Sequence, residues 1–383
     1  MSKFFMQKSF GQAMRKATRL TGVGKLMDAT RLIQRALSSA EPQVRRSPES
    51  AANDPQAGGV VDVPPQVIIL SAPSQPGTNT VTPQPGRKAS FTKHQFVFDG
   101  KTYPYRLYIP AAPALDASGA KPMPLVVLLH GCKQDALDFS NGTAMNALAE
   151  EHQAMVLYPE QITSANAMRC WNWFEPAHQK AARGEPGMIA ALTQQTVQQH
   201  GGDPQRVYIA GLSAGGAMAA VVSSLYPGIF AAVGVHSGLA AGAAQDVVSA
   251  FAAMRSGAKG RTAPVIPTIV FHGTADKTVH PDNGDHITDA ALAALKASGL
   301  ELVKTQGTPG QKGEENAGRV VYSTADGKSY IENWRIDDGT HAWSGGDAAG
   351  SYTDPDGPSA SAAMLTFFLQ HRLQRAAAAS SAV

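Results

Sequence analysis

Short apolar runs alternate with helix-like segments along the chain from residue 125 onward. Each run is bounded by turn residues, and a short run that is apolar throughout is typical of a strand buried on both faces. The runs are LVVLLH at 125–130, MVLYP at 155–159, RVYIA at 206–210, FAAVGVH at 230–236, TIVFH at 268–272 and YIENWRI at 330–336. We therefore expect an α/β fold, with a mostly parallel sheet and helices on both of its faces.

The segment before these runs has a different pattern. FTKHQFVF and TYPYRLYIP flank the dipeptide Asp99-Gly100, which is a strong signal for a two-residue β-hairpin turn. Because the hairpin is antiparallel, we expect it at one edge of the sheet. YIENWRI is expected to be the last strand, followed by a helix over about 358–373.

The first 90 residues differ in composition from the rest. Residues 1–46 carry ten Lys or Arg against two acidic residues, whereas the whole chain has a net charge of only +3. We predict a basic amphipathic helical arm over 1–40, a proline-rich disordered linker over 41–90, a catalytic domain over 91–373 and a frayed tail over 374–383. Since the main domain is net acidic, it is not expected to bind nucleic acid.

Two roles for the arm over 1–40 stay open. It docks on its own domain or on a dimer partner, or it adsorbs to a polymer granule or a membrane surface. The N-terminus lacks the uninterrupted apolar core of a secretory signal, which favours a cytoplasmic or granule-associated protein.

The stretch GLSAGG at 211–216 follows the strand RVYIA and precedes the helix-like AMAAVVSSLY. A G-x-S-x-G turn between a strand and a helix is the context of a nucleophile elbow. Glycines at 211 and 215 let the strand and the helix approach closely. We therefore predict that Ser213 is a nucleophile.

A serine hydroxyl needs a general base, and the base needs a group to orient it. Among eleven histidines, His341 lies in a loop directly after the last expected strand, while His236 and His272 lie at other strand ends. Asp276 follows the strand TIVFH, where its carboxylate is placed to accept a hydrogen bond from an imidazole. The predicted triad is Ser213, Asp276 and His341, in the chain order of the α/β hydrolases.

An oxyanion hole needs preorganised N–H donors. We expect one from Ala214, the residue after the nucleophile, and one from Cys132 in the loop HGCKQ. No His/Cys/Asp cluster with metal-ligand spacing and no G-x-G-x-x-G after a strand is present, so no cofactor and no metal are expected.

Five stretches together, LLHGCKQ, RCWNWF, GLSAGG, HGTADKTV and GTHAWSGG, resemble the esterases of the poly(3-hydroxybutyrate) depolymerase family, in the α/β-hydrolase superfamily. The resemblance covers roughly residues 90–370. It implies a serine esterase that acts on polyesters or oligoesters of 3-hydroxyalkanoates, and it makes an extracellular location the alternative, because many members are secreted. Feruloyl-type esterases are relatives. A polyamide hydrolase and a surface-binding protein with vestigial catalysis stay open as alternatives.

The cysteines and the aromatic residues of these stretches lie beside the expected site. Cys132 and Cys170 are either two thiols or one disulfide that would join the tryptophan-bearing loop to the oxyanion loop. Trp173 and Trp343 are expected to contact the substrate, because aromatic rings offer a large apolar area to an ester chain.

Overall fold

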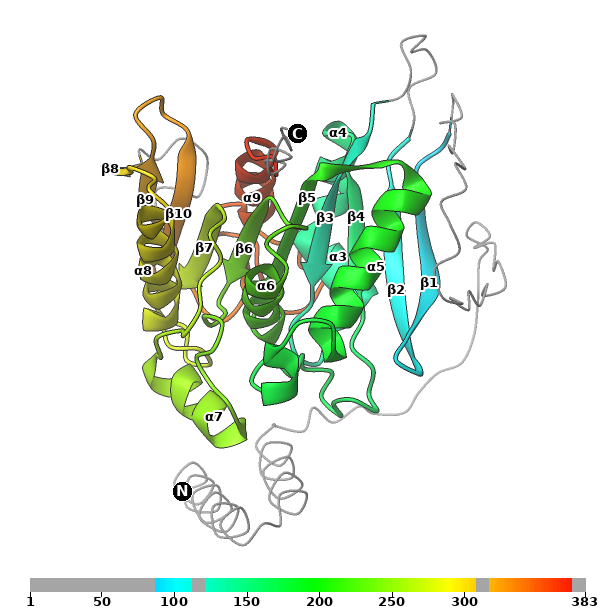
Figure 1. The fold of residues 1–383 in the computed structure, drawn as a ribbon, viewed down its shortest axis with the longest axis horizontal. Helices are drawn as coiled ribbons and strands as arrows, with labels where there is room; N and C mark the ends of the chain where they lie inside the picture. Colours follow the sequence, from blue (N-terminus) through cyan, green and yellow to red (C-terminus); the bar gives the residue numbers. More distant parts are fainter. Residues whose placement is uncertain (1–86, 112–120, 308–316, 374–383) are drawn as a thin grey trace, which may run out of the picture. The chain divides into compact units, whose positions relative to one another are not determined.

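The computed structural model describes residues 87–111, 121–307 and 317–373 (Figure 1). The predictions for the arm over 1–40 and for the tail over 374–383 lie outside these ranges, as does all but the end of the predicted linker over 41–90.

The described residues form a ten-stranded sheet in the order β1-β2-β4-β3-β5-β6-β7-β10-β9-β8 (Figure 1). The six strands from β4 to β10 in this order are parallel to one another, and they are the six apolar runs of the sequence. Their bounds are Met155–Pro159 (β4), Met123–Leu129 (β3), Gly202–Leu212 (β5), Ala232–His236 (β6), Thr268–Gly273 (β7) and Ser329–Ile336 (β10). The expected α/β fold with a mostly parallel sheet is confirmed.

Both edges of the sheet are antiparallel. At one edge, β1 (Ser90–Phe98) pairs with β2 (Lys101–Ile109) across a turn in which Asp99 and Gly100 both have positive φ, as a two-residue hairpin turn requires. At the other edge, β8 (Val303–Gln306) and β9 (Ala317–Ser323) extend the sheet beyond β10. The hairpin was expected from the sequence, and the second edge was not.

Helices cover both faces of the sheet, and each face has its own apolar core. On the face seen in Figure 1, side chains of α5, α6, α7 and α8 are buried; on the opposite face, side chains of α3, α4 and α9 are buried. The helices span Ala136–Thr143 (α3), Met145–Glu151 (α4), Gly184–His200 (α5), Ala214–Leu225 (α6), Val247–Ser256 (α7), Asp282–Ala297 (α8) and Ala360–Leu369 (α9), with one 3₁₀ turn at Pro176–Gln179 (η1).

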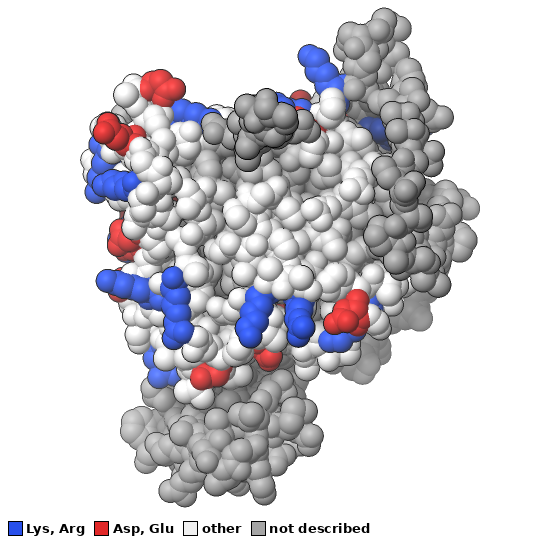
Figure 2. All heavy atoms as spheres, in the orientation of Figure 1, with Lys and Arg blue, Asp and Glu red and all other residues white. Residues whose placement is uncertain are grey.

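The upper and central part of this face carries few charged side chains, and a row that is mostly Lys and Arg crosses its lower part (Figure 2). Gln194, Gln198 and Gln199 are exposed on α5. Within the described ranges, no helix combines the length and the apolarity needed to cross a membrane.

The turn between β5 and α6 is packed against the end of β3. A β-carbon on Gly215 would overlap the backbone oxygens of Leu129 and His130, and one on Gly211 would overlap the backbone of Gly215 itself. Glycine is required here because backbone atoms cannot move aside as a flexible side chain would. The first turn of α6 is therefore held against the carboxyl end of β3.

We expect Gly215→Ala to destabilise the fold by at least about 3 kcal/mol, since the new methyl group overlaps backbone on two sides. Urea unfolding followed by circular dichroism measures the change. Gly228→Ala is the matched control, because a β-carbon there has no atom within 4 Å, and its effect should be small. A Gly215→Ala protein as stable as the control would contradict the packing described here.

Two fully buried histidines lie at strand ends, His130 after β3 and His236 at the end of β6. Burial lowers the pKa of His130 to about 4 and that of His236 to about 3. Nε2 of His130 accepts the Gln161 N–H at 3.1 Å, and Nε2 of His236 accepts the Ser344 N–H at 3.0 Å. Both rings are therefore neutral in the folded chain and hold backbone that arrives from another part of the sequence.

We expect the free energy of unfolding to fall as the pH drops from about 6.5 toward 4. The unfolded chain binds a proton at each histidine in this window and the folded chain does not, so each contributes a slope of about 1.4 kcal/mol per pH unit. Urea titrations at several pH values measure the slope. His130→Asn, whose amide is able to donate to the same carbonyl of Gly131 as Nδ1 does, should show a shallower slope; a flat profile in the unmutated protein would contradict the assignment.

Candidate active site

Ser213 occupies the turn that joins β5 to α6. Its backbone has φ 57° and ψ −120°, a sparsely populated conformation that costs on the order of 1–3 kcal/mol. The Ser213 N–H donates to the carbonyl of His236 at 2.9 Å, which fixes the turn to the end of the neighbouring strand. The residue is buried, with 8% of its surface exposed, so the turn holds it within a packed edge that leaves only a small opening to solvent.

Asp276 and His341 meet although they are 65 residues apart. Nδ1 of His341 lies 2.7 Å from Oδ2 of Asp276, and because an ionised carboxylate only accepts, Nδ1 is the donor. The other carboxylate oxygen accepts N–H groups of Thr278 at 2.8 Å and Val279 at 2.9 Å. The His341 ring is oriented through Nδ1, which leaves Nε2 as the atom able to take a proton.

The pKa of Asp276 is lowered well below its usual range. Burial alone would raise it, but the nearby imidazoles of His272 and His341, the second of which donates a hydrogen bond, and the Val279 N–H outweigh burial. The carboxylate is therefore ionised. Among the hydrogen bonds of the described residues, none joins the Ser213 hydroxyl to His341; such contacts often form only when substrate is bound.

His236 connects the turn of Ser213 to the loop of His341. Its carbonyl accepts the Ser213 N–H, and its ring accepts the N–H of Ser344, three residues after His341. The ring also stacks between Phe271 and Trp343, with centroid distances of 5.6 and 5.0 Å. From sequence, His236 was only one of several histidines at strand ends; the structure places it as a support for both segments.

The two tryptophans predicted to contact substrate are buried, Trp173 at 3% and Trp343 at 1% exposed. The Trp343 ring packs on His236 and edge-on against Phe139, and its Nε1 donates to Ser361 at 3.0 Å. Trp173 packs edge-on against Phe174. Both rings are packed in the core, so little of their surface is open to a ligand, and their contact with substrate stays a prediction.

The loop after β3 lies beside the nucleophile turn. A β-carbon on Gly131 would lie 3.7 Å from Cβ of Ser213. The next residue in this loop is Cys132, and Ala214 begins α6. Within the described part of the chain, neither the Cys132 N–H nor the Ala214 N–H donates to a protein acceptor. Two backbone donors beside a serine match what an oxyanion hole requires.

Gln134 holds this loop in place and was given no role in the sequence analysis. It is 2% exposed, and its Oε1 accepts the N–H of Gly131 at 2.9 Å. Its Nε2 donates to Asp138 at 2.9 Å and to the carbonyl of Ser351 at 3.0 Å. The side chain thus links the loop after β3 to the segment that follows His341. The signal in the sequence was its position two residues after Cys132.

A disulfide joins Cys132 to Cys170, so of the two possibilities considered for the cysteines the structure contains the bonded form. The loop of Cys170 is fixed from the other side by the buried carboxylate of Glu185. It accepts the N–H and the side-chain amide of Asn172 at 2.8 and 2.6 Å, and the amide of Gln161 at 2.6 Å. The tryptophan-bearing loop is therefore tied both to the loop after β3 and to α5.

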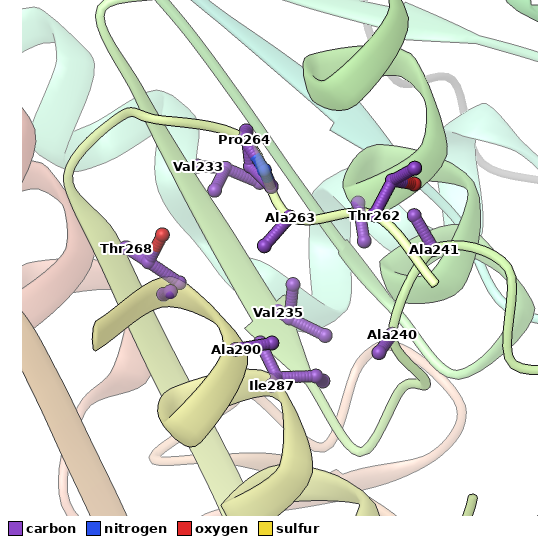
Figure 3. Close-up of a pocket in the computed structure, with 12 residues that line it drawn as sticks. Val233, Val235, Ala240, Ala241, Thr262, Ala263, Pro264, Thr268, Ile287 and Ala290 are labelled. Atoms are coloured by element: carbon purple, nitrogen blue, oxygen red, sulfur yellow. The ribbon is translucent and has the colours of Figure 1, made fainter. Parts of the chain in front are cut away.

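A small cavity of about 20 Å³ lies among β6, α6, α8 and the segment Thr262–Pro264 (Figure 3). Its walls are mainly alanine and valine side chains, and the hydroxyl of Thr268 already donates to Ile266. This volume holds about one water molecule, and no titratable group lines it. We interpret it as a packing gap between small residues. Within the described residues, no group of three or more His, Cys, Asp or Glu is placed to hold a metal ion.

Solved structures support the fold. The acetyl xylan esterase from Aspergillus awamori superposes with a TM-score of 0.53 over 73% of this chain and 99% of that chain, at 18% sequence identity. A similarity at this level of identity concerns the fold alone, and it agrees with the α/β-hydrolase fold implied by the sequence.

Curated relatives are similar in sequence over part of their length. Poly(3-hydroxyalkanoate) depolymerase C of Paucimonas lemoignei is 35% identical over 175 residues, which is 42% of each chain. Poly(3-hydroxybutyrate) depolymerase of Ralstonia pickettii is 30% identical over 62% of this chain and 51% of the relative. Feruloyl esterase B of Neurospora crassa is 32% identical over 33% of this chain and 42% of the relative. The chain thus spans about half the length of these relatives.

The family model described as "Esterase PHB depolymerase" matches residues 103–299, just over half of the chain, including Ser213 and Asp276. The resemblance inferred from the sequence is confirmed: the chain belongs to the PHB depolymerase family of esterases and has the α/β-hydrolase fold.

Proposed function

We propose that Ser213, His341 and Asp276 are a catalytic triad that cleaves esters through an acyl-enzyme. The observation that carries the proposal is the 2.7 Å hydrogen bond between His341 and Asp276 in a fold whose strained turn presents Ser213. Nε2 of His341 takes the hydroxyl proton as Ser213 attacks the ester carbonyl. Asp276 holds the ring in the required tautomer and stabilises the imidazolium without taking the proton.

The tetrahedral intermediate carries a negative charge on the former carbonyl oxygen. We assign its stabilisation to the backbone N–H groups of Cys132 and Ala214, the second of which lies at the N-terminus of α6, where the helix dipole favours negative charge. His341 then protonates the leaving alkoxide. A water molecule, deprotonated by His341, attacks the acyl-enzyme and releases the acid, which returns Ser213 to its hydroxyl form.

For the substrate we propose polyesters or oligoesters of 3-hydroxyalkanoates. Support comes from the two depolymerase relatives at 35% and 30% identity, the second of which aligns with the larger share of this chain. A second candidate is a feruloyl-type ester, favoured by a relative of similar identity over a shorter stretch. Both candidates use the same triad and differ only in the groups attached to the scissile ester.

We expect Ser213→Ala and His341→Ala each to lower kcat on p-nitrophenyl butyrate at least about a thousandfold, because each removes a member of one catalytic unit. His280→Ala is the matched control for His341, since His280 is an exposed histidine whose ring, among the described residues, pairs with Asp282. Its activity should stay near that of the unmutated protein. Folded variants that retain their turnover would exclude the triad.

The same proteins are then compared on a soluble 3-hydroxybutyrate oligomer, methyl ferulate and an oligopeptide. The proposed substrate class requires the highest kcat/KM on the oligomer, with Ser213→Ala inactive on all three. A clear preference for methyl ferulate would favour the second candidate, and cleavage of the peptide in preference to both esters would rule out an esterase specificity.

We expect Gln134→Leu to lower kcat about tenfold to a hundredfold with a much smaller change in KM, because it releases the loop of one oxyanion donor. Steady-state kinetics separates the two parameters. Gln199→Leu, an exposed glutamine of α5, is the control and should change neither parameter. Kinetics are measured far below the unfolding temperature of each variant, so that a loss of activity cannot come from partial unfolding. An unchanged kcat would contradict the role of Gln134.

A further inference from the structure

Tyr352 is an exposed aromatic residue in a strained conformation. Its φ is 55°, and a bulky residue in this left-handed region is an outlier that persists only where the surroundings impose it. Its side chain is 43% exposed, and it is the one exposed Phe, Tyr or Trp within the described ranges. Tyr352 is thus accessible to solvent in this conformation, whereas Trp343, whose N–H it binds, is packed in the core.

The surroundings that impose this conformation are specific. The Tyr352 carbonyl accepts the N–H of Trp343 at 2.7 Å, and Thr353 pairs with Trp343 where β11 (Trp343–Ser344) and β12 (Thr353–Asp354) meet. On the other side, the N–H and the hydroxyl of Ser351 donate to the two carboxylate oxygens of Asp138 at 2.9 and 2.6 Å. Both flanks of Tyr352 are thus fixed, and the residue between them has little freedom to relax.

The residue before Tyr352 also connects it to the loop after β3. The carbonyl of Ser351 accepts a hydrogen bond from Gln134, which holds the Gly131 N–H beside Ser213. Leu137, 42% exposed, precedes Asp138 on α3. Tyr352 and Leu137 each lie one residue from the Ser351–Asp138 pair, so two exposed side chains with large apolar area flank the contact that is tied through Gln134 to the loop of a proposed oxyanion donor.

We propose that Tyr352 is a substrate-contact residue that binds the part of an ester chain remote from the scissile bond. This rests on the proposed function, and the occupant is the aliphatic ester chain itself. A tyrosine ring offers apolar area at low conformational cost, and its hydroxyl is available to an ester carbonyl. Binding energy from remote parts of a substrate is used at the reacting centre, so its loss lowers kcat/KM for long substrates and leaves short ones unaffected.

The test compares Tyr352→Ala, Tyr352→Phe and Tyr352→Gly with the unmutated protein on two pairs of substrates. One pair is the methyl ester of a 3-hydroxybutyrate trimer and that of the monomer; the other is p-nitrophenyl octanoate and p-nitrophenyl acetate. Val303→Ala is the control, an exposed apolar residue of the edge strand β8. Thermal unfolding is measured for every variant, and Tyr352→Gly should not lower Tm, because glycine adopts this φ without strain.

We expect Tyr352→Ala and Tyr352→Gly to lower kcat/KM about tenfold on the long member of each pair and less than about twofold on the short one. Tyr352→Phe should retain most of the activity, and Val303→Ala should be unchanged on all four. If kcat/KM falls by the same factor on long and short substrates, or does not fall at all, the proposal is overturned. Tyr352 would then be a candidate for contact with another protein. If the unmutated protein cleaves the p-nitrophenyl esters but not the trimer, the proposed substrate class fails, and the octanoate and acetate pair still decides on Tyr352.

Discussion

The catalytic edge depends on the close approach of Gly215 to the end of β3. This contact leaves no room for a β-carbon, because the opposing atoms are the backbone oxygens of Leu129 and His130. The residues after His130 form the loop of Cys132, and Gly215 lies one residue after Ala214. The contact that positions the turn therefore also sets the spacing between the two N–H groups assigned to the oxyanion. A side chain at Gly215 would change the position of the turn and this spacing.

Separate side-chain contacts then connect the loops that follow different strands. Gln134 links the loop after β3 to the segment after His341, the disulfide links it to the loop of Cys170, and His236 links the turn of Ser213 to Ser344. Among the non-glycine residues with positive φ, Lys133, Ser213 and Ser237 lie in or next to these segments. Strained backbone persists only where the surrounding structure imposes it. Here the hydrogen bonds and the disulfide named above hold these segments in place.

The central strands could be predicted because a strand that is buried on both faces is a continuous apolar run. This pattern can be recognised without knowing which strands lie beside it. Strand β8 does not have this pattern, because all four of its residues are exposed. Ser213, Asp276 and His341 stood out because strand ends limit where they can lie. The burial of Trp343 could not be predicted, because an aromatic residue in such a loop looks the same in sequence whether it faces substrate or core. The side chain of Gln134 contacts Ser351, 217 residues further along the chain, so its position after Cys132 was not enough to reveal this link.

Two histidines approach the carboxylate of Asp276, and geometry distinguishes them. Nε2 of His272 lies 3.5 Å from Oδ2, beyond a good hydrogen bond, and lies 2.9 Å from the carbonyl of Val279. Since that carbonyl only accepts, the Nε2 proton of His272 is committed to it, and the ring is 2% exposed. His341 lies 2.7 Å from the same oxygen with 13% of its side chain exposed. Only His341 combines an orienting carboxylate at Nδ1 with access for a substrate at Nε2, which is why we assign it the base.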